Sequence, residues 1–260
     1  MKSGKLSFLS VVVTGILASG NSQAVTTTIP VTGWNVDIIA GVGEATTGNA
    51  SINATMDGGT LLGGFVYYQQ GVNGGSPATG LPAAGTLITS NTGSGASFSL
   101  QSYTASNALL LDGGTKTLTI GSPSRMSQIA LYGATGAGSG TDTVVVHYAD
   151  TTIQTFTSLS GSIGQDWFNG GSNAFTVNGR LNPNDGSFDQ VGSGNPRIYE
   201  ALLNLTNTTS PVTSVDITFT GSGHNVIYAI SGNVLVPEPS GAALLALGTL
   251  SLARRKRRTV

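Results

Sequence analysis

The feature that most limits the fold is a series of short segments in which apolar and polar residues alternate, separated by turns rich in glycine and asparagine. In residues 143–148, Val144, Val146 and Tyr148 share one face, and residues 212–220 repeat the pattern. A period of two places apolar side chains on one face of a β-strand and polar ones on the other. We therefore expect antiparallel sheets with one buried face.

Similar short segments predict strands along the rest of the body. The body runs from residue 25 to residue 235, and no segment within it has the apolar periodicity of a helix. Residues 25–31 are expected to form an irregular lead-in. These segments predict a single all-β domain, a jelly-roll-like antiparallel β-sandwich. The further strands are expected within residues 34–40, 60–70, 86–90, 96–100, 108–111, 116–120, 126–132, 152–159, 197–205 and 225–231.

Charge is unevenly distributed along the chain. The whole chain has 11 basic and 12 acidic residues, a net charge of −1. Only four basic residues but 11 acidic ones lie between residues 25 and 236, so the body alone carries 4 − 11 = −7. An acidic body argues against nucleic-acid binding, which requires a basic face. The chain contains no cysteine, which excludes disulfides and thiolate metal sites.

The N-terminus has the pattern of a secretory signal peptide. Lys2 and Lys5 precede an apolar stretch over residues 6–18, and Ser22-Gln23-Ala24 provides small residues at a cleavage site. We expect residues 1–24 to be a signal-peptide helix that is removed after export.

The C-terminus, residues 236–260, combines a turn, an apolar segment and a basic end. Residues 241–253 are uncharged and would span about 20 Å as a helix, less than the roughly 30 Å of a bilayer core. The basic end should stay on the cytoplasmic side, which places the body outside. The turn is Val236, Pro237, Glu238, Pro239 and Ser240; the short transmembrane helix includes Gly241, Leu244, Leu245, Leu247, Leu250 and Leu252; the basic end is Arg254, Arg255, Lys256, Arg257 and Arg258.

These three parts, in this order and at the terminus, resemble the PEP-CTERM sorting signal of Gram-negative bacteria. The resemblance covers about 25 residues. It implies processing by an exosortase, an integral-membrane cysteine protease that acts near the Pro-Glu-Pro segment. It also implies export through the inner membrane, with transient residence there, and a destination in the cell envelope, on the cell surface or in the extracellular matrix. Whether the tail is cleaved or retained stays open.

A second resemblance covers about half of the chain, residues 107–232. The segments Thr-Leu-Thr-Ile, Ile-Ala-Leu-Tyr, Thr-Val-Val-Val-His-Tyr-Ala-Asp, Asp-Trp-Phe, Ile-Tyr-Glu and Ile-Tyr-Ala-Ile-Ser-Gly follow one another in the order seen in galactose-binding-like sandwiches. Members of that fold are often carbohydrate-binding modules, and some hold a structural calcium ion. A fold alone does not establish a function.

Four residues are candidates for saccharide binding. The rings of Trp167 and Tyr199 could stack on a sugar, and Asp166 and Glu200 could accept its hydroxyl hydrogen bonds. The competing interpretation, which we favour, packs both rings in the core and uses Asp166 to cap a turn.

A structural calcium ion is the one cofactor that the sequence leaves open. Asp185 and Asp189 lie in and after the turn Asn182-Pro183-Asn184-Asp185-Gly186, which supplies oxygen-rich side chains. The pattern of the helix-loop-helix calcium site is not met, because Pro183 occupies a ligand position and no glutamate closes the loop. Ordinary turn chemistry explains the same residues.

No catalytic residues are predicted. His147 is expected on a sheet face and His224 in a loop, and no nucleophile elbow accompanies either histidine. The 11 acidic residues of the body are scattered without a local pair, although a glycoside hydrolase would need two that converge. We expect a non-enzymatic structural or matrix component of the cell surface. The alternative is a carbohydrate-binding module that recognises exopolysaccharide, and a hydrolase is the third choice.

Overall fold

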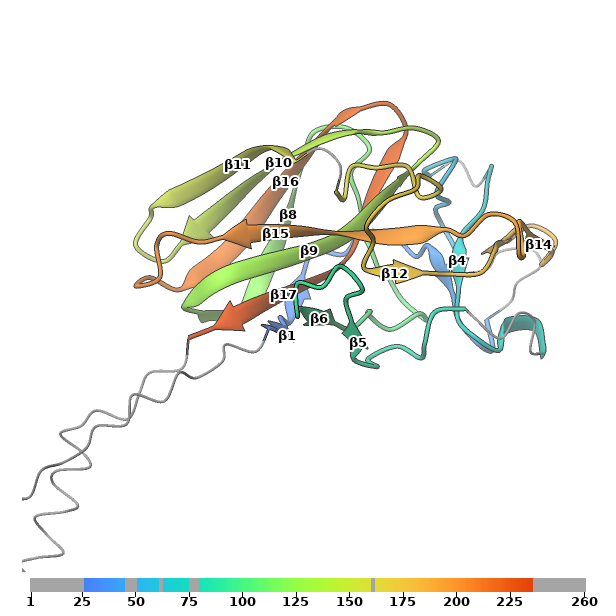
Figure 1. Cartoon of the computed structure of the whole chain (residues 1–260), viewed down its shortest axis with the longest axis horizontal. Coiled ribbons are helices and arrows are strands. Elements are labelled where there is room, and N and C mark those ends of the chain that lie inside the picture. The colour runs from blue at the N-terminus through green and yellow to red at the C-terminus, as the bar shows by residue number, and fades with distance from the viewer. Residues whose placement is uncertain (1–25, 45–50, 61–62, 75–79, 160–161, 236–260) are drawn as a thin grey trace, which may run out of the picture.

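A computed structural model describes residues 26–44, 51–60, 63–74, 80–159 and 162–235 (Figure 1). Within this part of the chain the fold is built from β-strands, and its larger sheets are antiparallel. The signal peptide of residues 1–24 and the sorting segment of residues 236–260, with the helices expected there, lie outside the described residues. Among the described residues no helix has the length and hydrophobicity that crossing a membrane requires.

The first large sheet, sheet A, has the strand order β1-β17-β9-β15-β12, and β7 also pairs with β17. Its strands are β1 (Thr26–Thr28), β7 (Leu109–Leu110), β9 (Met126–Gly136), β12 (Phe175–Thr176), β15 (Arg197–Asn204) and β17 (His224–Val234). The second, sheet B, has the order β11-β10-β16-β8-β2. Its strands are β2 (Val31–Thr32), β8 (Thr115–Ser124), β10 (Gly140–Tyr148), β11 (Ile153–Leu159) and β16 (Val212–Gly221).

The two sheets form a sandwich around a shared apolar core. Sheet B contributes alternate residues such as Leu118, Val144 and Ile217, and sheet A contributes residues such as Leu131 and Leu203. The residues between them in sequence on β10 and β16 face outward and are partly exposed. The alternation in the sequence therefore predicted the inner and outer faces of sheet B.

Sheet A is covered on its second face as well. Tyr132 and Tyr228 point away from sheet B into a separate apolar cluster. That cluster is completed by what we call the covering layer, the described residues within 36–108 and 165–196 apart from β12. Because both faces are buried, β9 and β17 are enclosed along almost their whole lengths. The molecule thus has three layers, and Figure 1 shows β4 and β14, two elements of the covering layer, on the side away from β11.

The covering layer contains only short elements. It includes a parallel pair, β3 and β4, which departs from the antiparallel pairing that the sequence predicted. Its other pairs are antiparallel. The elements are β3 (Ile39–Ala40), β4 (Tyr67–Tyr68), the 3₁₀ turn η1 (Val72–Gly74), β5 (Ile88–Thr89), β6 (Ser97–Phe98), β13 (Arg180–Leu181) and β14 (Phe188–Asp189).

Asparagine side chains add to the backbone bonds in and beside this layer. Asn35 exchanges two hydrogen bonds with the backbone of Leu110, and Oδ1 of Asn107 accepts from the Ile38 amide at 3.0 Å. A buried backbone group must find a partner, and an amide side chain offers both a donor and an acceptor. The strand predicted over residues 34–40 is therefore interrupted: Val36 forms a single antiparallel bridge with Ala108, side chains bond the amides of Asp37 and Ile38, and only residues 39–40 form a strand.

Two other expectations about strands need correction. Residues 26–28, expected in an irregular lead-in, form β1 and pair with residues 231–233 of β17. The strand expected within residues 126–132 is longer than predicted, because β9 continues to Gly136. Gly136 is required there, since a Cβ at this position would lie 2.0 Å from the carbonyl oxygen of Met56 in the covering layer.

Candidate functional site

The two rings proposed for saccharide stacking, Trp167 and Tyr199, are each 0% exposed. Trp167 packs edge-on against Tyr67 at a centroid distance of 5.2 Å. The Tyr199 hydroxyl donates to the carbonyl oxygens of Asp166 and Asn169. Both rings belong to the apolar cluster between sheet A and the covering layer. Neither has a face open to a ligand, so the packing interpretation of these rings fits the structure.

The carboxylates of the same group have structural partners. Oδ1 of Asp166 accepts from the amide of Phe168 at 2.8 Å, the capped turn that the sequence favoured. Oε1 of Glu200 accepts from the hydroxyl of Thr92 at 2.7 Å. Oε2 of Glu200 is buried without a hydrogen-bond partner among the described residues. The four residues therefore do not assemble into an open binding surface.

A charged cluster that the sequence did not reveal surrounds Arg180. Its guanidinium donates to Asp57 at 3.0 Å and to Asp189 at 2.9 Å, and it lies 3.8 Å above the ring centroid of Phe65. Burial raises the pKa of Asp57, and the nearby Arg180 opposes that rise. The contact between residues 57 and 180 spans 123 positions, so no local pattern could have predicted it. The cluster joins two parts of the covering layer.

The calcium candidates Asp185 and Asp189 do not converge on a common point. Oδ1 of Asp185 accepts from the Ser187 amide, and the side-chain hydrogen bond of Ser187 lowers the pKa of Asp185. Asp189 is bound to Arg180, whose hydrogen bond lowers its pKa. The turn itself is confirmed by the hydrogen bond from the Gly186 amide to the Asn182 carbonyl, at 2.9 Å. Within the described ranges no three acidic or histidine residues gather as a metal site would require.

Each histidine pairs with one aspartate. His147 lies on the outer face of sheet B, as predicted, with Nε2 at 2.8 Å from Oδ2 of Asp216. His224 is the first residue of β17 rather than part of a loop, and its Nδ1 lies 2.8 Å from Oδ1 of Asp112. All four side chains are roughly one-third exposed. The pair of His147 and Asp216 joins neighbouring strands of sheet B. The pair of His224 and Asp112 joins the start of β17 in sheet A to the segment that follows β7.

Two carboxyls are buried inside the protein. Asp142 lies on the inward face of β10, where neither oxygen has a hydrogen-bond partner among the described residues, and burial raises its pKa to about 7. Asp37 in the covering layer accepts from Nδ2 of Asn107, and burial, with the nearby Glu44, raises its pKa to about 7. Desolvation disfavours the charged form of a carboxyl, so both groups hold protons more tightly than exposed aspartates do.

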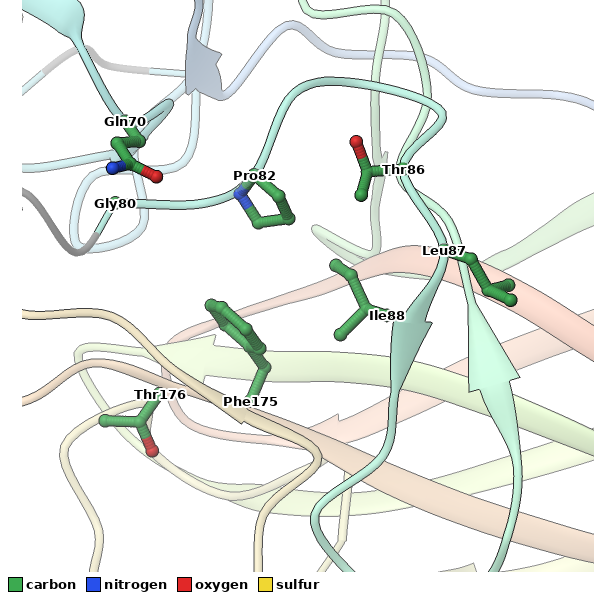
Figure 2. A pocket seen from close by; sticks show the side chains of 8 residues that line it. All are labelled: Gln70, Gly80, Pro82, Thr86, Leu87, Ile88, Phe175 and Thr176. Carbon is green, nitrogen blue, oxygen red and sulfur yellow. The ribbon is translucent and has the colours of Figure 1, made fainter.

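A hollow of about 370 Å³ lies between the covering layer and the β12 edge of sheet A. Figure 2 shows the Phe175 ring and Pro82 facing it, with Ile88 behind. Leu87 at the rim is 65% exposed. We call it the Phe175 hollow; its lining is Gln70, Gly80, Pro82, Thr86, Leu87, Ile88, Phe175 and Thr176.

The Phe175 hollow offers apolar surface with a few polar groups. It is lined by one aromatic ring, the amide of Gln70 and the side chains of Thr86 and Thr176, and none of its lining residues is charged. The Thr176 hydroxyl already donates to Oδ1 of Asn173. Such a lining can hold a small neutral ligand by stacking and hydrogen bonding. No local sequence pattern marks this hollow, because its residues come from three separated segments.

No protein-family model matches the chain, and no curated protein does so. Among solved structures, three variants of CBM29-2, a family 29 carbohydrate-binding module, align with 56–58% of this chain and 83–97% of theirs. The identity is 12–13% and the TM-score is 0.26 in each case. A likeness at this level bears on neither a ligand nor a site of this protein.

Proposed function

We propose that the chain is exported through the inner membrane, sorted by its C-terminal segment, and acts as a non-enzymatic structural or matrix component of the cell surface. The observation that carries the proposal is the order of turn, apolar segment and basic end in residues 236–258. An exosortase and the export machinery are the partners that this order implies. The acidic, cysteine-free body is compatible with an extracellular location.

The path of the chain supports attachment by one end of the body. Thr26 of β1 pairs with Asn233 of β17, so the first and last described strands meet in one ladder. The two ends of the body that the structure describes therefore lie close together (Figure 1). Removal of the signal peptide and capture of the tail would leave the rest of the surface free.

The test is a deletion of residues 237–260 in the native host. We expect the truncated protein to appear in the medium, whereas the complete protein stays with cells or matrix. A control with the five basic residues of the tail replaced by glutamines separates the charge requirement from the apolar segment. Unchanged cell association of the truncated protein would contradict the sorting proposal.

A second candidate function is the binding of a neutral saccharide in the Phe175 hollow. The supporting observation is the combination of the Phe175 ring and the Gln70 amide in one hollow. Phe175→Ala should weaken binding on a glycan array, because the Phe175 ring faces the hollow. The matched control is Phe188→Ala, another partly buried ring packed on the same apolar cluster, which does not line the hollow. Absence of binding by the unmodified protein to every polysaccharide would reject this candidate.

A further inference from the structure

The edges of the two large sheets differ in length. Sheet A ends in β1 and β12, which have 3 and 2 residues, and one edge of sheet B is β2, with 2 residues. The other edge of sheet B is β11, with 7 residues. Figure 1 shows β11 at the margin of the molecule, beside β10. A strand at an edge leaves every second backbone amide and carbonyl without a ladder partner, so β11 is the long unpaired edge among those described.

The sequence of β11 has none of the charged or proline residues that commonly protect such an edge. It is Ile-Gln-Thr-Phe-Thr-Ser-Leu. Ile153 is 59% exposed, and Thr155 and Thr157 are exposed as well. Lysine and proline are the usual means by which native proteins prevent pairing between edges. Their absence leaves β11 able to accept another extended strand.

The hydrogen-bond pattern shows which groups are open. The Tyr148 amide donates to the Thr152 carbonyl, and β10 then pairs with β11 in the register Val146 with Gln154 and Val144 with Phe156. In an antiparallel ladder bonded and unbonded pairs alternate, so Gln154 and Phe156 bond to β10. The backbone groups of Ile153 and Thr155 therefore face outward.

A bulge limits how far this edge can pair. The register shifts between Asp142 and Val144, where β11 has one more residue than β10, and Ser158 has a φ of 55°. Bulges bend a strand and end regular pairing. The regular part of the edge is thus short and centred on Gln154.

We propose that two copies of this chain associate through β11, antiparallel, about a two-fold axis at Gln154. In this register Ile153 lies opposite Thr155 of the partner subunit. The outward amides and carbonyls of these two residues in one chain then bond to those of the same two residues in the other. Asp150, the nearest charged residue, lies opposite Ser158 of the partner subunit, so no like charges meet. The other described edges of the two large sheets are too short for a third copy to pair with, so assembly stops at a dimer.

A second copy fits better than an unrelated strand because the edge is complementary to itself. Its exposed apolar residue, Ile153, meets the β-branched Thr155 of the partner subunit on the same face, a favourable cross-strand pair. The acidic residues that give the body its charge of −7 would repel a second copy elsewhere, but none lies within β11. This inference stands independently of the proposed function.

The absence of cysteine in the chain makes a direct test possible. In Gln154→Cys, the two thiols would face each other across an unbonded antiparallel pair, where Cα atoms are about 4.5 Å apart and a disulfide can form. We expect a disulfide-linked dimer of the full chain after mild oxidation, visible on a non-reducing gel. The control Thr143→Cys places a thiol on the outer face of sheet B, one strand in from the edge, and should stay monomeric.

A second variant keeps the test valid if the cysteine disturbs folding. Thr155→Pro removes an outward amide while leaving the bonds to β10, since proline is tolerated at an edge. In sedimentation velocity over a concentration series, the unmodified chain should shift towards a dimer and Thr155→Pro should not. Equal cross-linking at residues 143 and 154, adducts only with other proteins, or an unmodified chain that stays monomeric at every concentration would overturn the proposal.

Discussion

Sheets A and B face each other across one apolar core, yet sheet A is enclosed on both faces and sheet B on only one. Every residue of β9 from Ile129 to Gly136 is buried, whereas β10 alternates between buried and partly exposed residues. The difference comes from the covering layer, which supplies a second apolar cluster on one face of sheet A. A strand that is buried on both faces has a continuous apolar sequence, whereas a strand with one solvent-exposed face alternates apolar and polar residues. The pattern of apolar residues in a strand thus indicates whether one or both of its faces are covered.

The largest expected effect concerns the face of sheet A under the covering layer. Tyr132 is fully buried there and stacks on Phe98 at a centroid distance of 4.0 Å. Tyr132→Ala should lower the free energy of unfolding by about 3–5 kcal/mol, because it leaves a large cavity. Val145→Ala is the matched change on the outer face of sheet B and should cost less than about 1 kcal/mol. Denaturant unfolding measures both, and equal costs would mean that the layer does not pack as described.

The buried carboxyl between the sheets gives a pH-dependent effect. The folded pKa of Asp142, about 7, lies above its usual value of 3.8, so the folded state retains a proton that the unfolded state loses. Stability from this group is therefore full below pH 4, falls between about pH 4 and 7, and is then constant.

Asp142→Asn should flatten this decline, because the amide has no charged form for burial to disfavour; between pH 4 and pH 8 the variant should lose about 1–3 kcal/mol less stability than the unmodified protein. Melting temperatures measured from pH 4 to pH 8 provide the test. The slope that remains in the variant is expected to come from Asp37, whose pKa is also raised to about 7. If the dependence of the melting temperature on pH is the same in the variant, burial does not raise the pKa of Asp142 as described.

The contact between sheet A and the covering layer can be tested with glycine. Gly136→Ala puts a Cβ where the Met56 carbonyl already lies, whereas Gly121→Ala on β8 has its nearest neighbour at 3.3 Å. We expect a loss of about 1–3 kcal/mol for the first change, the usual range for overpacking. Gly121→Ala should lower the free energy of unfolding by less than about half of that amount. The comparison requires only thermal melts of the two variants.

The smallest effect is expected on the outer face of sheet B. His147 and Asp216 form a pair that is about one-third exposed, and such pairs contribute roughly 0–1 kcal/mol. His147→Ala and Asp216→Asn should each change stability by less than about 1 kcal/mol. A double-mutant cycle would detect any coupling, and a strong coupling would mean that this face is covered in the native protein.

The sandwich could be predicted from the sequence because its strands are long and periodic. Residues 143–148 and 212–220 alternate cleanly, and both proved to be strands of sheet B. The covering layer could not be predicted in the same way. Its strand pairs are only two residues long, side chains such as Asn107 bond part of its backbone, and its apolar residues follow no period, as the adjacent buried Ile38 and Ile39 show.

The candidate site was harder to predict than the fold. The sequence identified Trp167 and Tyr199 as rings near carboxylates, but composition does not tell whether a ring faces solvent or the core. The Arg180 cluster and the Phe175 hollow each join segments that are far apart in the chain. Their prediction would have required the tertiary contacts themselves.

The position of β17 has a mechanical consequence. This strand pairs with β9 along its whole length and with β1 and β7 on its other side, and it ends one residue before the last described position, Leu235. A force applied through the C-terminal segment would run along the strand axis. The backbone bonds on both sides of β17 would then bear the tension together instead of opening one after another. A protein held to a surface by this end would resist being pulled apart at its point of attachment.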